Sequence, residues 1–174
     1  MFRSKFEAYT FLSDAPDDLR CDFEVLTDEI SSMTGLLRAF VEDKHLQDDL
    51  LFIAEMVYHI NPSLRTKVTV TPDELSRLID MAKKLETQAG DTHKQFLLPV
   101  GNKAASLAHV LRARSKMVVR MLYRHNYGGN AVDDILYDFT NLLSNYFFLL
   151  AIRLNELDGT AEVPFVSRNY EVRQ

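Results

Sequence analysis

The chain carries five long stretches in which apolar side chains recur every three or four residues, the spacing of helices that bury one face. The first two helices are predicted over residues 19–41 and 46–60. Asn61-Pro62 ends the second, because the residue before a proline avoids the α conformation. The last two helices are predicted over 102–125 and 131–157.

The third of the five helices has the clearest start signal in the sequence. Thr71 is its predicted N-cap, with Pro72 in the first turn and Glu74 completing a capping box. Gly90 is the predicted C-terminal cap. Polar and apolar residues alternate over 63–70, which predicts an extended connection ahead of this helix rather than a paired strand.

The connections between the predicted helices are short. Pro99 and Gly101 indicate a non-helical loop over 95–101, and Gly128-Gly129 separates the last two helices. Five helices with short connections and no convincing strand pair predict an all-α fold. We expect a five-helix antiparallel bundle with the up-down packing of ferritin-like proteins.

Length and composition indicate one ordinary globular domain, because the chain has 174 residues and 47% hydrophobic residues. The net charge of −5 opposes non-specific nucleic-acid binding. The lone cysteine, Cys21, excludes an intramolecular disulfide and a multi-cysteine zinc site. We expect one domain over 1–174, made of an N-terminal segment (1–18), the bundle (19–157) and a C-terminal tail (158–174).

Neither a signal peptide nor a membrane span is expected. The N-terminus lacks a long apolar segment. The longest apolar run, Tyr146 to Ile152, is shorter than the roughly 20 residues that cross a bilayer. We therefore expect a cytoplasmic protein that does not bind membranes.

Basic residues form a stripe on the fourth predicted helix. His109, Arg112, Lys116 and Arg120 follow one another at steps of three and four residues, which places them on one side. Such a stripe is either a solvated face or a site for phosphate groups, and the spacing alone leaves both open.

The fifth predicted helix carries polar residues at the same spacing: Asp134, Asp138, Asn141 and Asn145. Acidic residues in a first turn are explained by the helix dipole. Asn141 and Asn145 lie among large apolar residues, where a polar side chain usually has a hydrogen-bond partner.

The residues by themselves define no reaction. The chain has no Walker loop, no dinucleotide-binding fingerprint and no nucleophile elbow. No metal site is predicted, because the histidines show no paired ligand spacing. Asp28 could be a surface carboxylate, and Phe96 a core side chain.

Four blocks of sequence are similar to the PduO-type cobalamin adenosyltransferases. Residues 96–112 resemble that family's F-x-L-P-x-G followed by L-H-x-x-R, and 140–148 resemble L-N-R-L-S-D-Y-L-F. Residues 27–32 resemble V-D-E-L-N-S, and the tail over 155–168 resembles the family's ending. The blocks occur in the family's order, and the family's five-helix bundle agrees with the periodicity.

The resemblance implies transfer of the 5′-deoxyadenosyl group of ATP to cob(I)alamin, with Mg²⁺ sharing the phosphate charge, in a homotrimer whose active sites lie between subunits. It implies that Phe96 presses on the lower face of the corrin and displaces the axial ligand. It also implies a salt bridge between Arg112 and Asp28 of different subunits.

Further roles come from the same resemblance. Lys116 stands where the family has an ATP-binding Arg, and Arg120 matches the last Arg of that cluster. Asn141 would bind ligand phosphate, and Asn145 stands where the family has an Asp. Phe165 falls near an aromatic residue of the tail that closes over the site.

Departures from the family pattern leave three interpretations open. The N-terminal T-x-T-G-D-x-G loop is absent, and Met117 and Val119 replace an Arg and a Glu. Residues 18–23 resemble the ethanolamine-utilisation branch, EutT, whose cysteine cluster is missing here. The protein is then a divergent enzyme, a carrier that delivers adenosylcobalamin to a dependent enzyme, or an unrelated bundle acting as an interaction module.

Overall fold

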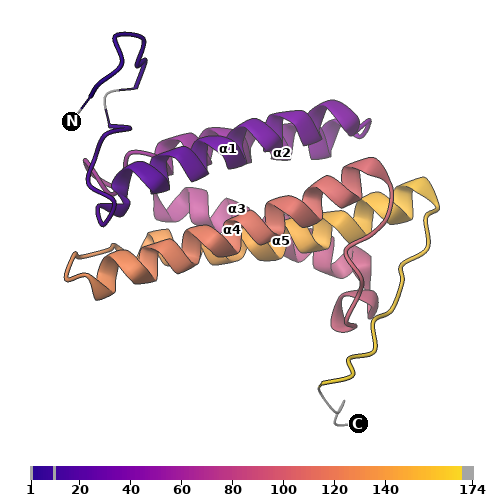
Figure 1. Cartoon of the computed structure of the whole chain (residues 1–174). Coiled ribbons are helices and arrows are strands. Elements are labelled where there is room, and N and C mark those ends of the chain that lie inside the picture. Colours follow the sequence, from indigo (N-terminus) through magenta and orange to yellow (C-terminus); the bar gives the residue numbers. More distant parts are fainter. Residues whose placement is uncertain (1, 10, 170–174) are drawn as a thin grey trace.

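Five α-helices make up most of the computed structural model, which describes residues 2–9 and 11–169 (Figure 1). A short 3₁₀ turn, η1, precedes the fourth helix. The elements are α1 (Leu19–Phe40), α2 (Lys44–Ile60), α3 (Pro72–Ala89), η1 (Thr92–Lys94), α4 (Lys103–Tyr127) and α5 (Asp134–Asp158). The predicted all-α, five-helix fold is confirmed.

Side-chain caps fix where the helices begin. The predicted capping box at the start of α3 is present, with Thr71 and Glu74 each bonded to the other's backbone N–H. Asn102 caps α4 by accepting a hydrogen bond from the backbone of Ala105. Asp133 caps α5, so this helix begins later than the predicted residue 131. A cap residue lies outside the helix that it stabilises, which explains the shift.

Two connections differ from the prediction. Residues 62–66 form hydrogen-bonded turns, in which the Thr66 N–H donates to the Pro62 carbonyl at 2.9 Å, so only 67–70 are extended. The 3₁₀ turn η1 was not predicted, because three residues are too few to show a periodicity.

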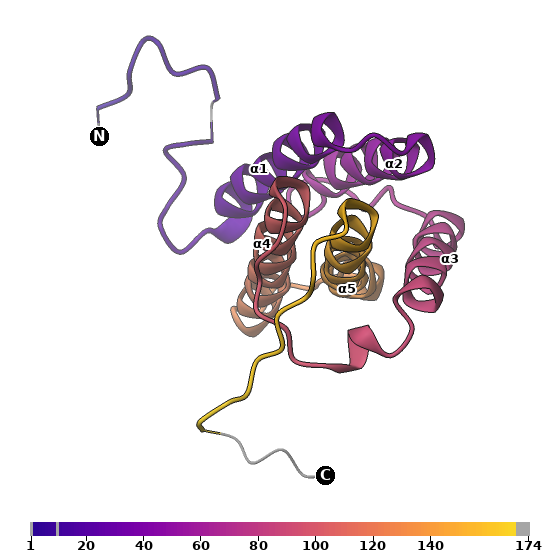
Figure 2. The same ribbon diagram turned by 90° about the vertical axis from the view of Figure 1, so that its right-hand side faces the viewer.

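The end-on view in Figure 2 places α5 in the middle of the bundle, with α1 and α2 on one side and α3 and α4 flanking it. Consecutive helices run in opposite directions (Figure 1). The most extensive packing joins α4 to α5, followed by α1 with α2 and α3 with α5. The central position of α5 explains why its large side chains, among them Phe139, Tyr146 and Phe147, are fully buried.

Among the described helices, α5 alone is long and apolar enough to cross a membrane by length and composition. In the bundle, 61% of its apolar window is buried. Its apolar character is therefore accounted for by its place in the core.

An ion network holds part of the N-terminal segment against the bundle. The Arg65 Nε lies 2.8 Å from Oε1 of Glu24, a carboxylate only 4% exposed, and Arg65 Nη2 lies 2.8 Å from Asp14. The Tyr9 hydroxyl donates to Glu24 at 2.6 Å. Burial, and then the bond to Glu24, raises the pKa of Tyr9 to about 12. The guanidinium also stacks 3.6 Å from the centre of the Phe11 ring.

We predict that Arg65→Met destabilises the protein by about 3–5 kcal/mol, because it leaves the Glu24 carboxylate buried without its cation. The double variant Arg65→Met/Glu24→Gln should recover much of that loss. Urea denaturation at pH 7, followed by circular dichroism, measures both. A loss below about 1 kcal/mol, typical of an exposed pair, would contradict a structural role for this network.

Candidate active site

A cavity of about 470 Å³ lies where α4, α5 and the loop before α4 meet. The loop contributes residues 93–97, α4 contributes Arg112 and Lys116, and α5 contributes Asn141, Ser144, Asn145 and Phe148. Five of the residues predicted from the sequence line this cavity together: Phe96, Arg112, Lys116, Asn141 and Asn145.

Helical spacing explains why these side chains converge. Arg112 and Lys116 are four residues apart on α4, and Asn141 and Asn145 are four apart on α5, so each pair occupies neighbouring turns of one face. The Ser144 hydroxyl donates to the Arg112 carbonyl at 3.2 Å and so ties the two helices together beside the cavity.

The cavity lining is cationic and amide-rich. Its described residues include the basic side chains of His93, Lys94, Arg112 and Lys116, and none is a carboxylate. The Arg112 Nε is buried and has no hydrogen-bond partner within the described residues. Its guanidinium carbon lies 5.9 Å from the centre of the Phe148 ring. Since a buried donor without a partner is costly, this group is prepared to bind an acceptor.

The two asparagines differ in their bonding. The Asn141 amide donates to the Tyr137 carbonyl at 2.9 Å, as the setting predicted, whereas no hydrogen bond of the Asn145 side chain occurs among the described residues. Both side chains are exposed toward the cavity rather than embedded in the core.

Phe96 stands at the cavity with 77% of its surface exposed, so it is not a core side chain. The C-terminal tail pairs with its loop. The Phe165 N–H donates to the Phe96 carbonyl at 2.7 Å, and the Leu98 N–H donates to the Val163 carbonyl at 2.9 Å. Phe165, 48% exposed, is thereby placed beside Phe96, although it does not line the cavity.

A buried amide anchors this loop and the tail. Asn155, fully buried near the end of α5, accepts a hydrogen bond from the Asn102 N–H at 3.1 Å. Its amide nitrogen donates to the Val100 carbonyl and to Glu162. Gly101 has a φ of 147° and packs so closely that any Cβ there would collide with the Asn155 amide. Asn155 was not predicted as a site residue, although a polar residue beside the apolar Leu154 in a core helix was a usable signal.

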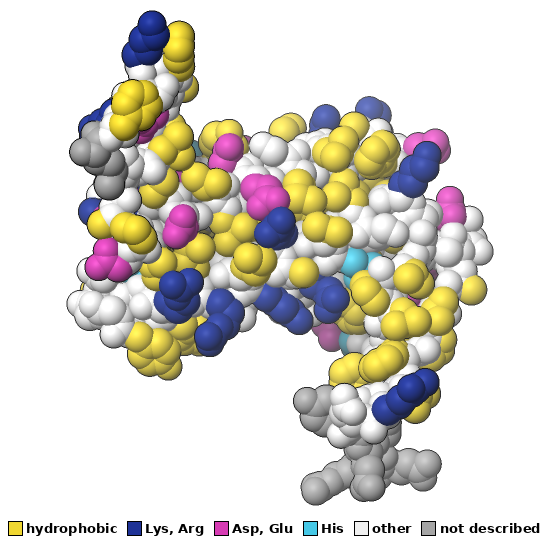
Figure 3. All heavy atoms as spheres, viewed as in Figure 1, with side chains coloured by type: hydrophobic (Ala, Val, Ile, Leu, Met, Phe, Trp, Pro, Cys, Tyr) yellow, Lys and Arg dark blue, Asp and Glu magenta, His cyan; other side chains and the backbone are white. Residues whose placement is uncertain are grey.

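Two predicted site residues lie away from the cavity. Asp28 is exposed on α1 and accepts a hydrogen bond from the Tyr58 hydroxyl at 2.7 Å, and no ion pair joins it to Arg112 within the described chain. Arg120 is exposed on α4, one turn beyond Lys116. Figure 3 shows Lys and Arg side chains gathered along this side of the molecule.

His109 does not belong to the exposed cationic stripe, which corrects the prediction. It is 4% exposed, and neither ring nitrogen has a hydrogen-bond partner within the described residues. Its ring centre lies 6.4 Å from that of Phe148. Burial, and secondarily the nearby Arg112 charge, lowers the pKa of His109 to about 4. The stripe therefore begins at Arg112.

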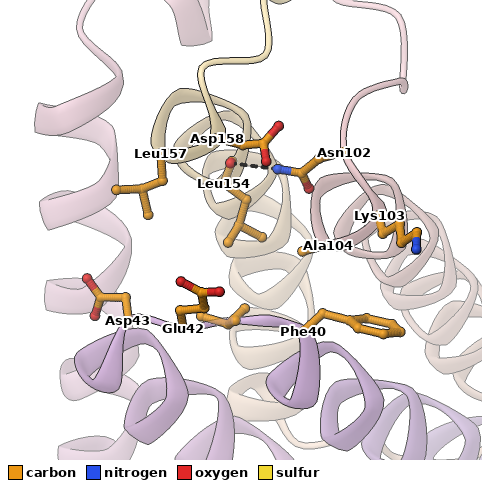
Figure 4. A pocket seen from close by; sticks show the side chains of 10 residues that line it. Phe40, Glu42, Asp43, Asn102, Lys103, Ala104, Leu154, Leu157 and Asp158 are labelled. Carbon is orange, nitrogen blue, oxygen red and sulfur yellow. Dashed lines mark hydrogen bonds between the residues drawn. The ribbon is translucent and has the colours of Figure 1, made fainter.

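A larger cavity of about 660 Å³ lies at the end of the bundle where α1 ends and α4 begins (Figure 4). Its lining includes the carboxylates of Glu42, Asp43 and Asp158 and only one cation, Lys103. These carboxylates disfavour an anionic ligand, so size does not make this cavity the better candidate. No group of three or more His, Cys, Asp or Glu side chains in the described part of the chain could hold a metal ion.

The structure thus shows an antiparallel helical bundle with a candidate ligand site between α4 and α5, whose cations, amides and exposed aromatic ring would suit an anionic group next to a flat apolar one. Comparison with known proteins identifies the family. The chain belongs to the cobalamin adenosyltransferases, whose family model matches residues 15–154.

Individual relatives agree with this assignment. The corrinoid adenosyltransferase of Bacillus subtilis (strain 168) is 27% identical over 158 residues, covering 86% of this chain and 81% of that protein. Two variant structures of the PduO-type ATP:corrinoid adenosyltransferase from Lactobacillus reuteri, complexed with cobalamin and ATP, share the fold. One has a TM-score of 0.76 at 20% identity, covering 95% of this chain and 98% of that chain. The other has a TM-score of 0.74 at 21% identity, covering 86% and 87%.

We predict that the protein loses stability as the pH falls from about 6.5 to about 4, partly through His109. Across this range the unfolded histidine binds a proton and the folded one does not, so His109 opposes folding below the unfolded pKa and has no effect on it above that pKa. The contribution reaches about 3 kcal/mol at the acid end.

The difference in unfolding free energy between His109→Leu and the wild type should therefore shift in favour of the variant as the pH falls. Urea denaturation at several pH values measures it, and His45→Leu, a change at an exposed histidine, is the control. A pH-independent difference for His109→Leu would show that the ring is protonated equally in both states.

Proposed function

We propose that this protein is an ATP:corrinoid adenosyltransferase, which transfers the 5′-deoxyadenosyl group of ATP to cob(I)alamin. The observation that carries the proposal is the convergence of Phe96, Arg112, Lys116 and two asparagines on one cavity, in a chain that belongs to this family. Two stretches of the chain, 96–116 and 141–145, supply these side chains, and the fold brings them together at the cavity.

The reaction is a nucleophilic displacement at the 5′ carbon of ATP. The Co(I) electron pair forms the new cobalt–carbon bond, the bond from that carbon to oxygen breaks, and its electron pair leaves with triphosphate. Lys116 would stabilise the charge on the leaving group, and no carboxylate among the described lining residues would oppose it. Mg²⁺ would arrive bound to the triphosphate oxygens, because the cavity offers no carboxylate ligand for it.

Phe96 would act on the other side of the corrin. Its exposed ring, held by the paired tail, can cover the lower face and exclude water or a base as an axial ligand. A cobalt without that ligand is easier to reduce to the nucleophilic Co(I) state. Phe165 would lie at the edge of the same surface.

A homotrimer is the proposed assembly. Within one chain, Arg112 and Asp28 form no ion pair with each other. A salt bridge between them would therefore have to join two copies. The exposed Val25, Val110 and Met117 flank the ion pair of Glu29 with Arg114, which joins α1 to α4 at 3.0 Å. Figure 3 shows hydrophobic side chains on this face, which a second copy would cover.

The site of action and the fate of the product are part of the proposal. ATP is a cytoplasmic substrate, and Cys21, the lone cysteine, is unpaired as cytoplasmic thiols are. We place the reaction in the cytoplasm, with the adenosylated corrinoid passing to an adenosylcobalamin-dependent enzyme.

The direct test is a visible-absorbance assay with chemically reduced cob(I)alamin, ATP and Mg²⁺. Growth of the adenosylcobalamin spectrum at catalytic protein concentration would establish the activity. No growth, with a spectral shift when adenosylcobalamin is added in stoichiometric amount, would instead favour a corrinoid carrier. No change in either experiment would overturn corrinoid binding altogether.

Phe96→Ala should lower the rate of adenosylation by about tenfold or more, which corresponds to about 1.4 kcal/mol of transition-state stabilisation. The ring is exposed, so the fold and the assembly state should not change. Phe6→Ala, at another exposed ring in the N-terminal segment, is the matched control. A wild-type rate for Phe96→Ala would remove this ring from the mechanism.

Lys116→Ala should raise the KM for ATP by about tenfold, the effect of losing one charge-assisted contact to phosphate. Lys103→Ala removes another exposed lysine, at the start of α4 and outside this cavity, and should leave the KM unchanged. Equal KM values for the two variants would assign Lys116 to a solvated face.

A further inference from the structure

The loop that carries Phe96 brings two basic residues to the cavity that the family pattern does not assign. His93 and Lys94 belong to η1 and line the cavity together with Arg112 and Lys116. The cavity thus receives cations from the loop as well as from α4. With a net charge of −5 on the chain, a lining whose described residues include no carboxylate marks a place where an anion is stabilised.

The present partners of these two side chains are weak. Lys94 Nζ lies 2.7 Å from Asp91, with both side chains mostly exposed, at 68% and 89%. His93 Nε2 lies 3.4 Å from Glu86, while His93 Nδ1 is buried and has no hydrogen-bond partner within the described residues. An exposed pair such as that of Lys94 with Asp91 contributes little stability, so a ligand can replace it at small cost. Neither carboxylate lines the cavity.

We propose that His93 and Lys94 form a phosphate subsite of this cavity, distinct from the Lys116 side. The inference rests on the proposed function, because it takes the two substrates, ATP and a corrinoid, from there. Phosphate has two sources in such a reaction: the triphosphate of ATP and the phosphodiester in the nucleotide loop of cobalamin. Phosphate oxygens accept charge-assisted hydrogen bonds from lysine and from protonated histidine.

Position favours the cobalamin phosphodiester. Phe96 follows Lys94 by two residues, and the proposed function puts Phe96 against the lower corrin face. The nucleotide loop of cobalamin is attached on that face, and it must move aside when the axial base is displaced. A basic turn immediately before Phe96 would hold the displaced loop, whereas the reacting 5′ carbon of ATP approaches the upper face.

The test is the dissociation constant of the wild type and of Lys94→Ala for three probes, measured by isothermal titration calorimetry. The probes are cobalamin, cobinamide (a corrinoid without the nucleotide loop and its phosphate) and ATP. We expect Lys94→Ala to weaken cobalamin binding by about five- to tenfold and to leave cobinamide binding unchanged. Weaker ATP binding with unchanged cobalamin binding would instead assign the subsite to the triphosphate.

Three further variants separate a ligand contact from a structural role. Asp91→Asn removes the carboxylate that competes for Lys94. It should tighten binding of the probe that Lys94→Ala weakens. Lys83→Ala, at an exposed lysine of α3 that lines no described cavity, should have no effect. His93→Gln should weaken binding in the same sense as Lys94→Ala.

Unchanged constants for all probes in Lys94→Ala would overturn the subsite. Because these are binding constants, that result is distinct from failure of the proposed function. A wild type that binds its probes without turnover would contradict the transferase reaction and leave the subsite standing, whereas a wild type that binds none of the probes would overturn both.

Discussion

The hydrogen bonds of Asn155 are the interaction on which the site geometry depends. This one buried amide near the end of α5 binds the backbone just before α4, the loop that carries Phe96, and Glu162 in the tail. Asn102 adds a second link by donating to the Leu154 carbonyl at 2.8 Å while it caps α4. These bonds fix the register of α4 against α5. A slip of one residue would turn Arg112 and Lys116 by about 100° away from the cavity.

The electrostatics of the cavity follow from that register. The acidic residues of this chain outnumber the basic ones, yet the α4–α5 groove collects Arg112 and Lys116 with amides and no described carboxylate. Like charges on one helix face repel by a few tenths of a kcal/mol per pair. An arrangement that is mildly unfavourable in the empty protein and favourable around a phosphate is typical of a binding site. The buried Arg112 Nε without a described partner is a further sign of this.

Apolar periodicity predicted the five helices because each buries one face. The cap residue Thr71 predicted the first residue of α3 correctly. Periodicity did not distinguish the buried His109 from the half-buried Arg112, because both fall near the edge of the buried face of α4. Short turns such as 62–66 and η1 carry no repeat to detect.

The candidate site likewise contains residues that the sequence predicted and residues that only the structure reveals. Helical spacing singled out the residues of α4 and α5, and the resemblance to the family gave them and Phe96 their roles. Their convergence on one cavity required the fold. The roles of Asp28 and Arg120 remain predictions, because a single chain does not bring them to the cavity. His93, Lys94 and Asn155 were missed because their importance depends on what lies next to them in space, which spacing along the chain does not encode.

The most direct test of the account is the position of cobalt in a crystal grown with ATP and cob(II)alamin, located by its anomalous scattering. We predict one cobalt peak per site, above the Phe96 ring and beside the cavity between α4 and α5. A peak in the larger cavity of Figure 4, or anywhere remote from Phe96, would contradict the assignment of the corrinoid site.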